Sequence, residues 1–375
     1  MRALVLVAAL AGCGRVGFEE RVDGAAADAP GNALCGFRDR PSLAMGAANT
    51  CIVRIDGSLW CSGEAWGTRF VQVGTSTRYL RVDAEEESYC ALDLDCELSC
   101  WGDNNNGELG LGDMTSRPTT PTPVMPGTRW REVGAGGFHT CGIRDDDALF
   151  CWGRNLEGEL GVDDKIDRHV PTRVGTDTWT HLARGYLFTC ASDVQNRLWC
   201  WGANDSGQLG AGLGPDVIAP QLVPGGAWHR ATAGKQHICA LDDSGRAWCW
   251  GLNMMGQLGA GNSMTPVAQP QQITGSATWT ALAAGRFTTC GLQGAALWCW
   301  GDNAFGAVGV PGMTNVTSPV NIQTPAAWSA LSPMNVSTCA IDAAGELYCW
   351  GANSAGQLGL GDTMPRTVPA KVTFP

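Results

Sequence analysis

The chain has 375 residues, a formal net charge of -11 and only 16% charged side chains. Lys and Arg form no dense cluster, so the sequence offers no electrostatic footprint for phosphate backbones, and nucleic acid is excluded as an expected partner. Helix-forming residues are scarce, while 51 Gly, 19 Pro and 16 Trp are spread along the chain. This composition favours short strands joined by tight turns, and therefore an all-β class.

The N-terminus has the pattern of a targeting signal. Arg2 precedes an apolar run that is too short to span a bilayer. Leu10–Cys13 is similar to the lipobox of bacterial lipoproteins, in which cleavage leaves Cys13 as a lipidated N-terminus; a plain secretory signal is the alternative. The following residues are small, polar and mildly acidic, as in a flexible tether. We expect a lipoprotein-type signal peptide at 1–12, a tether at 13–33 and one domain at 34–375, exported and either lipid-anchored at the cell envelope or secreted.

A tandem repeat occupies the rest of the chain. Its most regular part is a Cys-Trp-Gly strand followed by a glycine-rich loop, as in CWGANDSGQLG from Cys200. The heads of this segment are Cys61 (degenerate, CSG), Cys100, Cys151, Cys200, Cys249, Cys299 and Cys349. After a first interval of 39 residues the spacings are 49 to 51 residues, the range of four-stranded propeller blades. Seven blades are therefore predicted.

A second cysteine lies nine or ten residues before each head. In CALDDSGRAWC a hairpin with its loop at 243–245 places Leu241 opposite Ala247 and Cys239 opposite Cys249. The sixth repeat is one residue shorter, and a Gly294-Ala295 loop preserves the pairing. Directly opposed residues lie within the span that a disulfide accepts. The predicted bridges are Cys51–Cys61, Cys90–Cys100, Cys141–Cys151, Cys190–Cys200, Cys239–Cys249, Cys290–Cys299 and Cys339–Cys349.

Three cysteines remain. Cys13 belongs to the lipobox, and Cys35 and Cys96 are candidates for a bridge between blades. Such cysteine usage is ordinary in an exported protein and unusual in a reducing cytosol. The alternative is that the cysteines are small buried apolar residues in reduced form. Zinc is disfavoured, because the sequence has no CxxC pair and no histidine at ligand spacing.

The strand and loop of each repeat have separate structural roles. In LWCW, Trp199 and Trp201 point to one face of the strand, where we expect them to fill the space between blades. The glycines of the loop allow positive φ or close backbone approach. DNNNG at 103–107 fails as a calcium loop, because Gly102 stands where the first Asp ligand is required, so Asn104 is interpreted as structural. No cofactor or metal is expected.

WGxNxxGQLGxG, preceded by segments such as WREVGAGGFHTCGI at 130–143, resembles the repeat of the regulator of chromosome condensation (RCC1-like) family. The resemblance covers about residues 40–375 and implies a seven-bladed β-propeller. The first repeat departs from it, because CSGEAWGTRF lacks the NxxGQLG segment. The cysteine pairs are an addition to the family pattern. For ring closure we expect a strand at 42–45 to join the last strand at 367–372.

One pair of positions varies from repeat to repeat within an otherwise regular frame. It lies just before the His139 position, in a loop that we expect on one face of the ring. The mixture of aromatic residues and both charge signs there is typical of a protein-binding patch, and the resemblance also implies partner contacts on this face. Unconstrained loop residues are the alternative. The candidate residues are Glu86, Glu87, Phe138, Tyr186, Leu187, Lys235, Gln236, Arg286, Phe287 and Asn335.

Catalysis is not indicated. The sequence has no GxSxG, P-loop or HExxH motif, and His139 and His237 occupy equivalent positions that suggest hydrogen-bonded fasteners of a loop. We therefore expect a monomeric, non-enzymatic scaffold that binds a protein or glycan, touching a membrane only through its anchor. Two alternatives follow from the resemblance: inhibition of a secreted enzyme such as a β-lactamase, and nucleotide exchange on a small GTPase.

Overall fold

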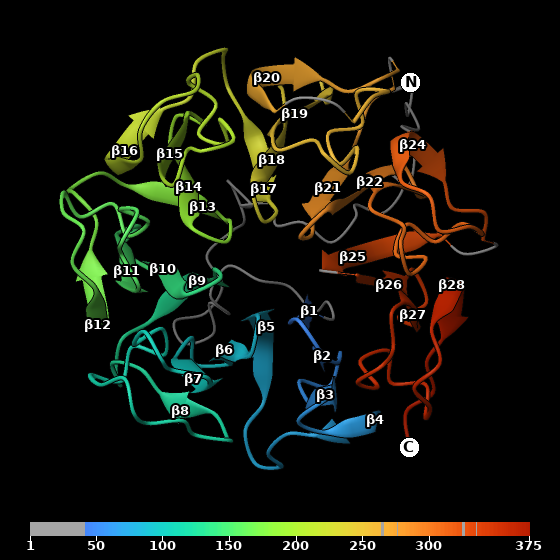
Figure 1. Ribbon diagram of the computed structural model, residues 1–375. Helices are drawn as coiled ribbons and strands as arrows, with labels where there is room; N and C mark the ends of the chain where they lie inside the picture. Colours follow the sequence, from blue (N-terminus) through green and yellow to red (C-terminus); the bar gives the residue numbers. More distant parts are fainter. Residues whose placement is uncertain (1–41, 264–265, 276, 325–326, 335) are drawn as a thin grey trace, which may run out of the picture.

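The computed structural model describes residues 42–263, 266–275, 277–324, 327–334 and 336–375. These residues form seven four-stranded antiparallel sheets around a central axis, so the fold is an all-β, seven-bladed β-propeller (Figure 1). The first strand of each blade lies at the axis and contacts the first strands of the neighbouring blades, while the fourth strand forms the rim (Figure 1). In the described part of the chain, no helix has the length and apolar character to span a membrane.

Each blade uses four strands that are consecutive in the chain. Blades 1 to 4 consist of β1 (Ser42–Met45), β2 (Asn49–Val53), β3 (Leu59–Gly63), β4 (Gly67–Gln72); β5 (Tyr79–Glu85), β6 (Ser88–Asp93), β7 (Leu98–Gly102), β8 (Thr122–Pro123); β9 (Trp130–Ala135), β10 (His139–Arg144), β11 (Leu149–Gly153), β12 (Arg168–Arg173); and β13 (Trp179–Arg184), β14 (Phe188–Asp193), β15 (Leu198–Gly202), β16 (Val217–Leu222). Blades 5 to 7 consist of β17 (His229–Ala233), β18 (His237–Leu241), β19 (Ala247–Gly251), β20 (Val267–Gln272); β21 (Ala281–Ala284), β22 (Thr288–Gln293), β23 (Ala296–Gly301), β24 (Val316–Asn321); and β25 (Trp328–Met334), β26 (Ser337–Asp342), β27 (Leu347–Gly351), β28 (Arg366–Lys371).

The hairpin between the second and third strands carries a disulfide in every blade. Leu241 pairs with Ala247 and Cys239 with Cys249, and the shorter hairpin of blade 6 keeps Cys290 opposite Cys299, so the predicted register is confirmed. The paired Cα atoms are 4.1 to 4.2 Å apart. Seven disulfides join described cysteines to one another: Cys51–Cys61, Cys90–Cys100, Cys141–Cys151, Cys190–Cys200, Cys239–Cys249, Cys290–Cys299 and Cys339–Cys349.

Of the three remaining cysteines, only Cys96 lies within the described residues. Cys96 is buried and also disulfide-bonded. Cys35, its predicted partner, and Cys13, the predicted lipidation site, lie outside the described residues. The signal peptide at 1–12 and the tether at 13–33 lie outside them as well, so these assignments stay predictions.

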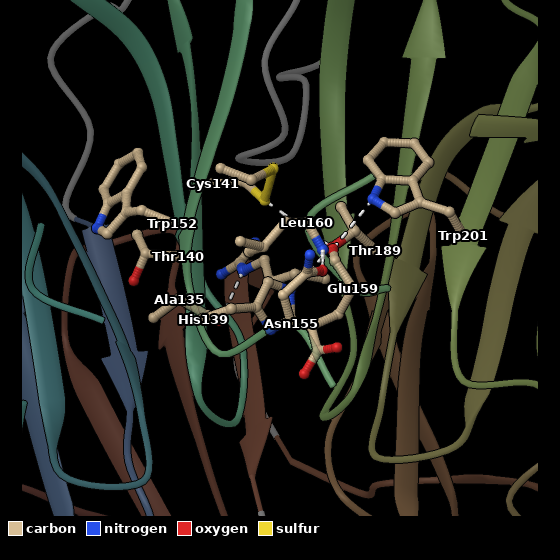
Figure 2. Close-up of a disulfide and its surroundings, with 12 residues drawn as sticks. Ala135, His139, Thr140, Cys141, Trp152, Asn155, Glu159, Leu160, Thr189 and Trp201 are labelled. Carbon is tan, nitrogen blue, oxygen red and sulfur yellow. Dashed lines mark hydrogen bonds between the residues drawn. A yellow bond between two sulfur atoms is a disulfide. The ribbon is translucent and has the colours of Figure 1, made fainter. Parts of the chain in front are cut away.

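Neighbouring blades are joined through one backbone carbonyl in the glycine-rich loop. The Glu159 carbonyl in blade 3 accepts hydrogen bonds from Trp201 Nε1 (3.0 Å) and Thr189 Oγ1 (2.8 Å) of blade 4. Figure 2 shows these two side chains pointing from their strands to the loop that contains Asn155, Glu159 and Leu160. Because Trp201 is buried and its indole would otherwise lose its bond to water, this contact fixes the position of one blade against the next. The tryptophans of the CWG segments are thus packing residues, as predicted.

The same arrangement recurs around the ring. The carbonyls of Glu108, Gln208, Gln257 and Ala307 each accept a hydrogen bond from the tryptophan of the following blade, at 2.9 to 3.1 Å. The loop glycines allow the close approach: a Cβ on Gly207 would lie 2.5 Å from the Ala268 side chain on the next outer strand, and one on Gly210 would lie 2.7 Å from Trp250 Nε1. The repeated Cys-Trp-Gly strand and its glycine-rich loop therefore form the contact surface between blades.

Blade 1 lacks this loop, and the consequences are visible on both sides of it. β3 and β4 are joined directly by 64–66. In the part of the chain that the structure describes, Trp101 Nε1 of blade 2 meets no acceptor, because no loop carbonyl precedes it. On the other side, Ser62 replaces the tryptophan, and Phe70 fills its place against Gly359 of blade 7.

The predicted closure of the ring is wrong. β1 pairs with β2, with Ala44 opposite Cys51, and β28 pairs with β27, so no strand crosses between the first and last blades. The seam is formed instead by the loop of blade 7, whose Gly361 N donates to Thr68 O at 2.7 Å on β4. Gly261 N makes the same bond to Thr317 O at 2.8 Å between blades 5 and 6. Blade 1 has its own fourth strand, β4, despite its short loop. Its sheet is therefore complete without a strand from the C-terminal end of the chain.

Replacing Cys239 and Cys249 together by Ala is expected to lower the free energy of unfolding by about 2–3 kcal/mol, because the bridge closes a short loop in the unfolded chain. Urea unfolding of both proteins measures the difference. Repeating the experiment in excess reductant is the control: the two proteins should then unfold at similar urea concentrations. A difference that survives reduction would assign the loss to packing instead of to the bridge.

Gly356→Ala is expected to weaken the seam. Its φ is 80°, and a Cβ there would lie 2.7 Å from Thr68 Cα in blade 1. Gly345→Ala is the matched control, because Gly345 has a φ of 83° but no atom within 4 Å of the added Cβ. In both variants an Ala must adopt a left-handed backbone conformation, which should lower the free energy of unfolding by about 1–2 kcal/mol. The seam variant should lose about 1–3 kcal/mol more, because its Cβ overpacks the contact with blade 1. Equal losses in urea unfolding would contradict the seam contact.

Candidate functional site

Two sets of loops share one face of the ring. The chain of each blade runs up and down four times, so the loop after the first strand and the loop after the third strand lie at the same end. We call the first set the inner loops (46–48, 86–87, 136–138, 185–187, 234–236 and 285–287) and the second the outer loops (103–121, 154–167, 203–216, 252–263, 302–315 and 352–365). Together they form the loop face, and the inner loops surround the mouth of the central channel.

Backbone hydrogen bonds connect the inner loops to one another. Tyr186 N donates to Lys235 O (3.4 Å), and Lys235 N donates to Arg286 O (3.3 Å). Gly137 N reaches Tyr186 O at 3.1 Å in the same direction around the ring. The variable residues of blades 3 to 6 are therefore held on a continuous backbone rim, which gives their side chains defined positions.

Aromatic and cationic side chains gather on this rim. The rings of Phe138 and Tyr186 meet edge to face, with centroids 5.0 Å apart. Lys235 Nζ lies 4.8 Å from the centroid of Tyr186 and 5.8 Å from that of Phe287. Arg286 Cζ lies 5.8 and 5.7 Å from the same two centroids. Four blades thus contribute to one cluster of cations and aromatic faces.

Acidic residues of blade 2 complete the channel mouth. Arg286 Nη1 of blade 6 lies 3.9 Å from Glu86 Oε1. Just below, Arg184 of β13 forms an ion pair with Asp83 of β5. Burial, followed by the neighbouring Glu86, raises the pKa of Glu85 to about 8. A cavity of about 10 Å³ remains at the mouth, with lining residues that include Glu85, Arg184, Tyr186, Lys235 and Arg286.

The candidate residues divide into two groups. Glu86, Tyr186, Lys235 and Arg286 come together at the channel mouth, with Phe138 and Phe287 beside them. The other members act through their carbonyls, which accept hydrogen bonds of 2.8 to 3.0 Å from the starts of the outer loops in the pairs Glu87–Asp103, Leu187–Ala203 and Gln236–Leu252. Asn335 lies outside the described residues. The second group is therefore partly structural.

Sequence reasoning missed an apolar component of the same face. Leu156, Met254 and Phe305 occupy the two variable positions of NxxG in the outer loops and are 56%, 62% and 48% exposed. Leu213 and Met313, farther along these loops, are exposed as well. The signal was present in the sequence, because Leu156 and Met254 stand where other repeats carry Asp205 or Ser354, and Phe305 stands where they carry Ser206 or Ala355.

The two equivalent histidines fasten the structure, as the sequence suggested. His139 Nε2 is 2.8 Å from Thr189 Oγ1, and His237 Nε2 is 2.9 Å from Thr289 Oγ1, each reaching into the next blade. Both are fully buried. Burial lowers the pKa of each imidazole to about 3, so both are neutral near pH 7.

The DNNNG turn and the acidic hairpin tip are also structural. Asn104 Nδ2 donates to Asp113 O, and its Oδ1 accepts from Leu109 N, which ties the outer loop across its base. At the tip between β10 and β11, Asp147 forms an ion pair with Arg131 at 2.9 Å. Within the described ranges, no group of three or more His, Cys, Asp or Glu side chains is arranged to hold a metal ion.

Comparison with known proteins agrees with this architecture. The family model described as RCC1-like domain matches residues 80–375. Among curated proteins, the ultraviolet-B receptor UVR8 of Arabidopsis thaliana is 41% identical over 91 residues, which are 24% of this chain and 20% of that protein. The probable E3 ubiquitin-protein ligase HERC4 of Rattus norvegicus is 41% identical over 83 residues, 22% of this chain and 8% of that protein. The matched segments are thus short parts of these relatives.

Solved structures share the fold. The crystal structure of Prp20p from Saccharomyces cerevisiae superposes with a TM-score of 0.77 at 19% identity, covering 84% of this chain and 85% of that one. The CRINKLY WD40 ectodomain of the Arabidopsis thaliana receptor kinase ACR4 superposes with a TM-score of 0.54 at 19% identity, covering 88% and 97%. At these identities the likeness concerns the fold alone.

The buried histidines predict a pH dependence of stability. Below about pH 6.5 the unfolded chain takes up protons at His139 and His237, while the folded chain does not until about pH 3. The free energy of unfolding should therefore fall with the pH by about 2 kcal/mol per histidine between pH 6.5 and 4.5. Replacing both by Phe, the residue at the equivalent position 188, should remove this part of the loss. Urea unfolding at the two pH values measures it, and parallel losses in both proteins would contradict the assignment.

Proposed function

This chain belongs to the RCC1-like domain family, and from its loop face we propose that it is a non-enzymatic scaffold that binds a protein partner. The observation that carries the proposal is the contrast between a regular, buried frame and one face on which aromatic, cationic and apolar side chains are exposed. Tyr186, Lys235 and Arg286 stand at the centre of this face, and Met254 and Phe305 stand farther out. Protein interfaces typically have aromatic and Arg side chains at their centre and other side chains, including Met, around them.

The exposed apolar side chains support a macromolecular partner. Met254 lies in a stretch, 252–263, that contains no charged side chain. Its neighbour Met255 packs against the outer loop of blade 6, where its sulfur lies 3.2 Å from Asn315 Nδ2. Methionines adapt their shape to a partner, and contiguous exposed apolar area is costly in an isolated soluble protein. A protein that covers blades 5 and 6 would remove this area from water.

The side chains that could act as an acid or base are already bonded to other residues of the chain, and this supports a binding function over catalysis. His139 and His237 are buried fasteners between blades, and Asp147 is held by Arg131. Rate enhancement needs an acid, base or nucleophile that is free to reach a substrate. Lys235 and Arg286, the half-buried cations of the mouth, are suited to hold an anionic group in place.

The disulfides indicate an oxidising location, and a reducing cytosol would not preserve seven of them. We extend the proposal to an exported protein held at the cell envelope through lipidated Cys13 and the tether at 13–33. Prp20p of Saccharomyces cerevisiae binds Gsp1p and histones. Export would separate this chain from such intracellular partners, so nucleotide exchange is not our proposal.

The proposal is tested by capture of envelope and secreted proteins on the immobilised domain. Replacing Met254 and Phe305 by Ser should weaken capture of the partner by about tenfold or more, because two apolar anchors are lost. The matched control replaces Ile55 and Val194, exposed to 77% and 43% on the opposite face, by Ser and should leave capture unchanged. A variant with Phe138, Tyr186 and Phe287 changed to Ala tests the inner loops.

Two outcomes decide between the readings. If the loop-face and opposite-face variants capture the same proteins equally, the binding face is assigned wrongly. If the captured protein is a secreted enzyme, such as a β-lactamase, its activity is measured with the domain added, and loss of that activity would identify the scaffold as an inhibitor.

A further inference from the structure

Two cations at the channel mouth have unused hydrogen-bonding capacity. In the described part of the chain, neither the Lys235 ammonium nor the Arg286 guanidinium makes a hydrogen bond, and Arg286 Nε is buried without a partner. The nearest anion, Glu86 Oε1, lies 3.9 Å from Arg286 Nη1, which is too far for a hydrogen bond. An ammonium has three donors and a guanidinium five, so these groups are prepared to receive acceptors.

The surroundings of these donors restrict what can reach them. The rings of Tyr186 and Phe287 lie under both cations and form apolar walls. The adjoining cavity of about 10 Å³ is lined by Lys235, Arg286 and Arg184 and accepts one atom of the size of a water oxygen. One oxygen of a planar carboxylate fits, with its second oxygen left on the open side.

We propose that the channel mouth is a carboxylate-binding site, in which Lys235 and Arg286 donate hydrogen bonds to one carboxylate and Tyr186 and Phe287 form its walls. The inference rests on the proposed function: the carboxylate belongs to an acidic side chain of the protein that binds the loop face. Glu86 of the chain itself already places a carboxylate at the rim of this site, which shows that the chemistry suits the position.

The charges at the mouth favour an incoming anion near neutral pH. Asp83 pairs with Arg184, and Glu86 lies next to Arg286. Glu85 is largely protonated at pH 7, because burial and the adjacent Glu86 raise its pKa to about 8. Among the described residues, no ionised carboxylate therefore remains to balance Lys235, so their charges at the mouth sum to a positive value in a chain whose net charge is -11.

This balance gives the site a pH dependence with a defined sign. Two acidic residues of the same segment, Glu86 and Asp83, face Glu85. Two cations face it from other blades: Arg184 of β13 and Arg286 of the blade 6 inner loop. Tyr186 and Lys235 line the same cavity. Burial raises the pKa of Tyr186, so its hydroxyl stays neutral. Burial and Arg286 lower the pKa of Lys235. As the pH rises through about 8, Glu85 gains its charge, and this change weakens the binding of an anion.

The composition of the chain allows a direct test. Lys165, Lys235 and Lys371 are the only lysines in the sequence, so incorporation of ¹³Cε-labelled lysine during expression gives one Cε resonance for each and keeps all three N–H donors of every ammonium. Lys165 and Lys371 are exposed and ion-paired with Asp216 and Glu346, which makes them internal controls. The full domain is titrated with acetate at constant ionic strength, and the ¹³C resonances are followed.

The Lys235 resonance should shift and saturate with acetate near neutral pH, while those of Lys165 and Lys371 should not. Arg286→Gln should weaken the acetate affinity by about tenfold through the loss of charge-assisted hydrogen bonds. Arg246→Gln, at a hairpin tip on the opposite face, should leave the affinity unchanged. Raising the pH to about 9 should weaken acetate binding in the unmodified sequence and less so in Glu85→Gln. No saturation, or equal saturation by chloride, would overturn the carboxylate site.

The source of the carboxylate is decided with the partner captured on the loop face. If that protein supplies the group, Arg286→Gln lowers its affinity and acetate competes with it. If acetate saturates Lys235 but the partner's affinity is the same for Arg286→Gln, the source is a small free carboxylate and the assignment to a partner side chain is overturned. Acetate binding without any captured partner would refute the proposed function and leave the site standing.

Discussion

One backbone carbonyl in each repeat after the first holds this ring together. The carbonyl of Glu159 and its equivalents accept hydrogen bonds from an indole and, in most blades, a threonine hydroxyl of the next blade, inside an apolar layer from which water is excluded. Buried donors need partners, so a blade can satisfy its tryptophan only by docking against its neighbour. The glycines around the carbonyl remove the side chains that would prevent this approach. Stability within a blade comes from the hairpin and its disulfide, and stability between blades comes from this contact.

Most of the frame could be predicted from local sequence. The two-residue period of a strand and the length of each hairpin loop fix which residues stand opposite one another, and the pairing of Cys290 with Cys299 survived a deletion for that reason. The closure of the ring was predicted wrongly, because the repeat pattern alone does not show whether strands are shared between the end blades. The decisive residues, Phe70 in place of a tryptophan and Thr68 on β4, lie in the most degenerate repeat, where alignment carries the least information.

The candidate site was predictable in position but not in composition. Comparing the repeats showed which loop positions vary, and the strand topology put them on one face. That Glu86 and Arg286 meet across the channel depends on the curvature of seven packed blades, which no local pattern encodes. The division of the variable pairs, with Gln236 holding an outer loop through its carbonyl while Lys235 faces the mouth, also needed three-dimensional information. Met254 and Phe305 stand at variable positions of the outer loops, so a comparison restricted to the inner-loop positions does not include them.

The seam between blades 7 and 1 uses the same noncovalent contact as the other junctions, and each blade is complete in sequence. No junction is therefore topologically special. The backbone gap between the last strand and the first is one of seven places between complete blades at which such a circle can be opened, so rotating the order of the repeats along a gene would preserve every four-stranded sheet. Evolution by exchange or reordering of whole blades is open to a fold of this kind.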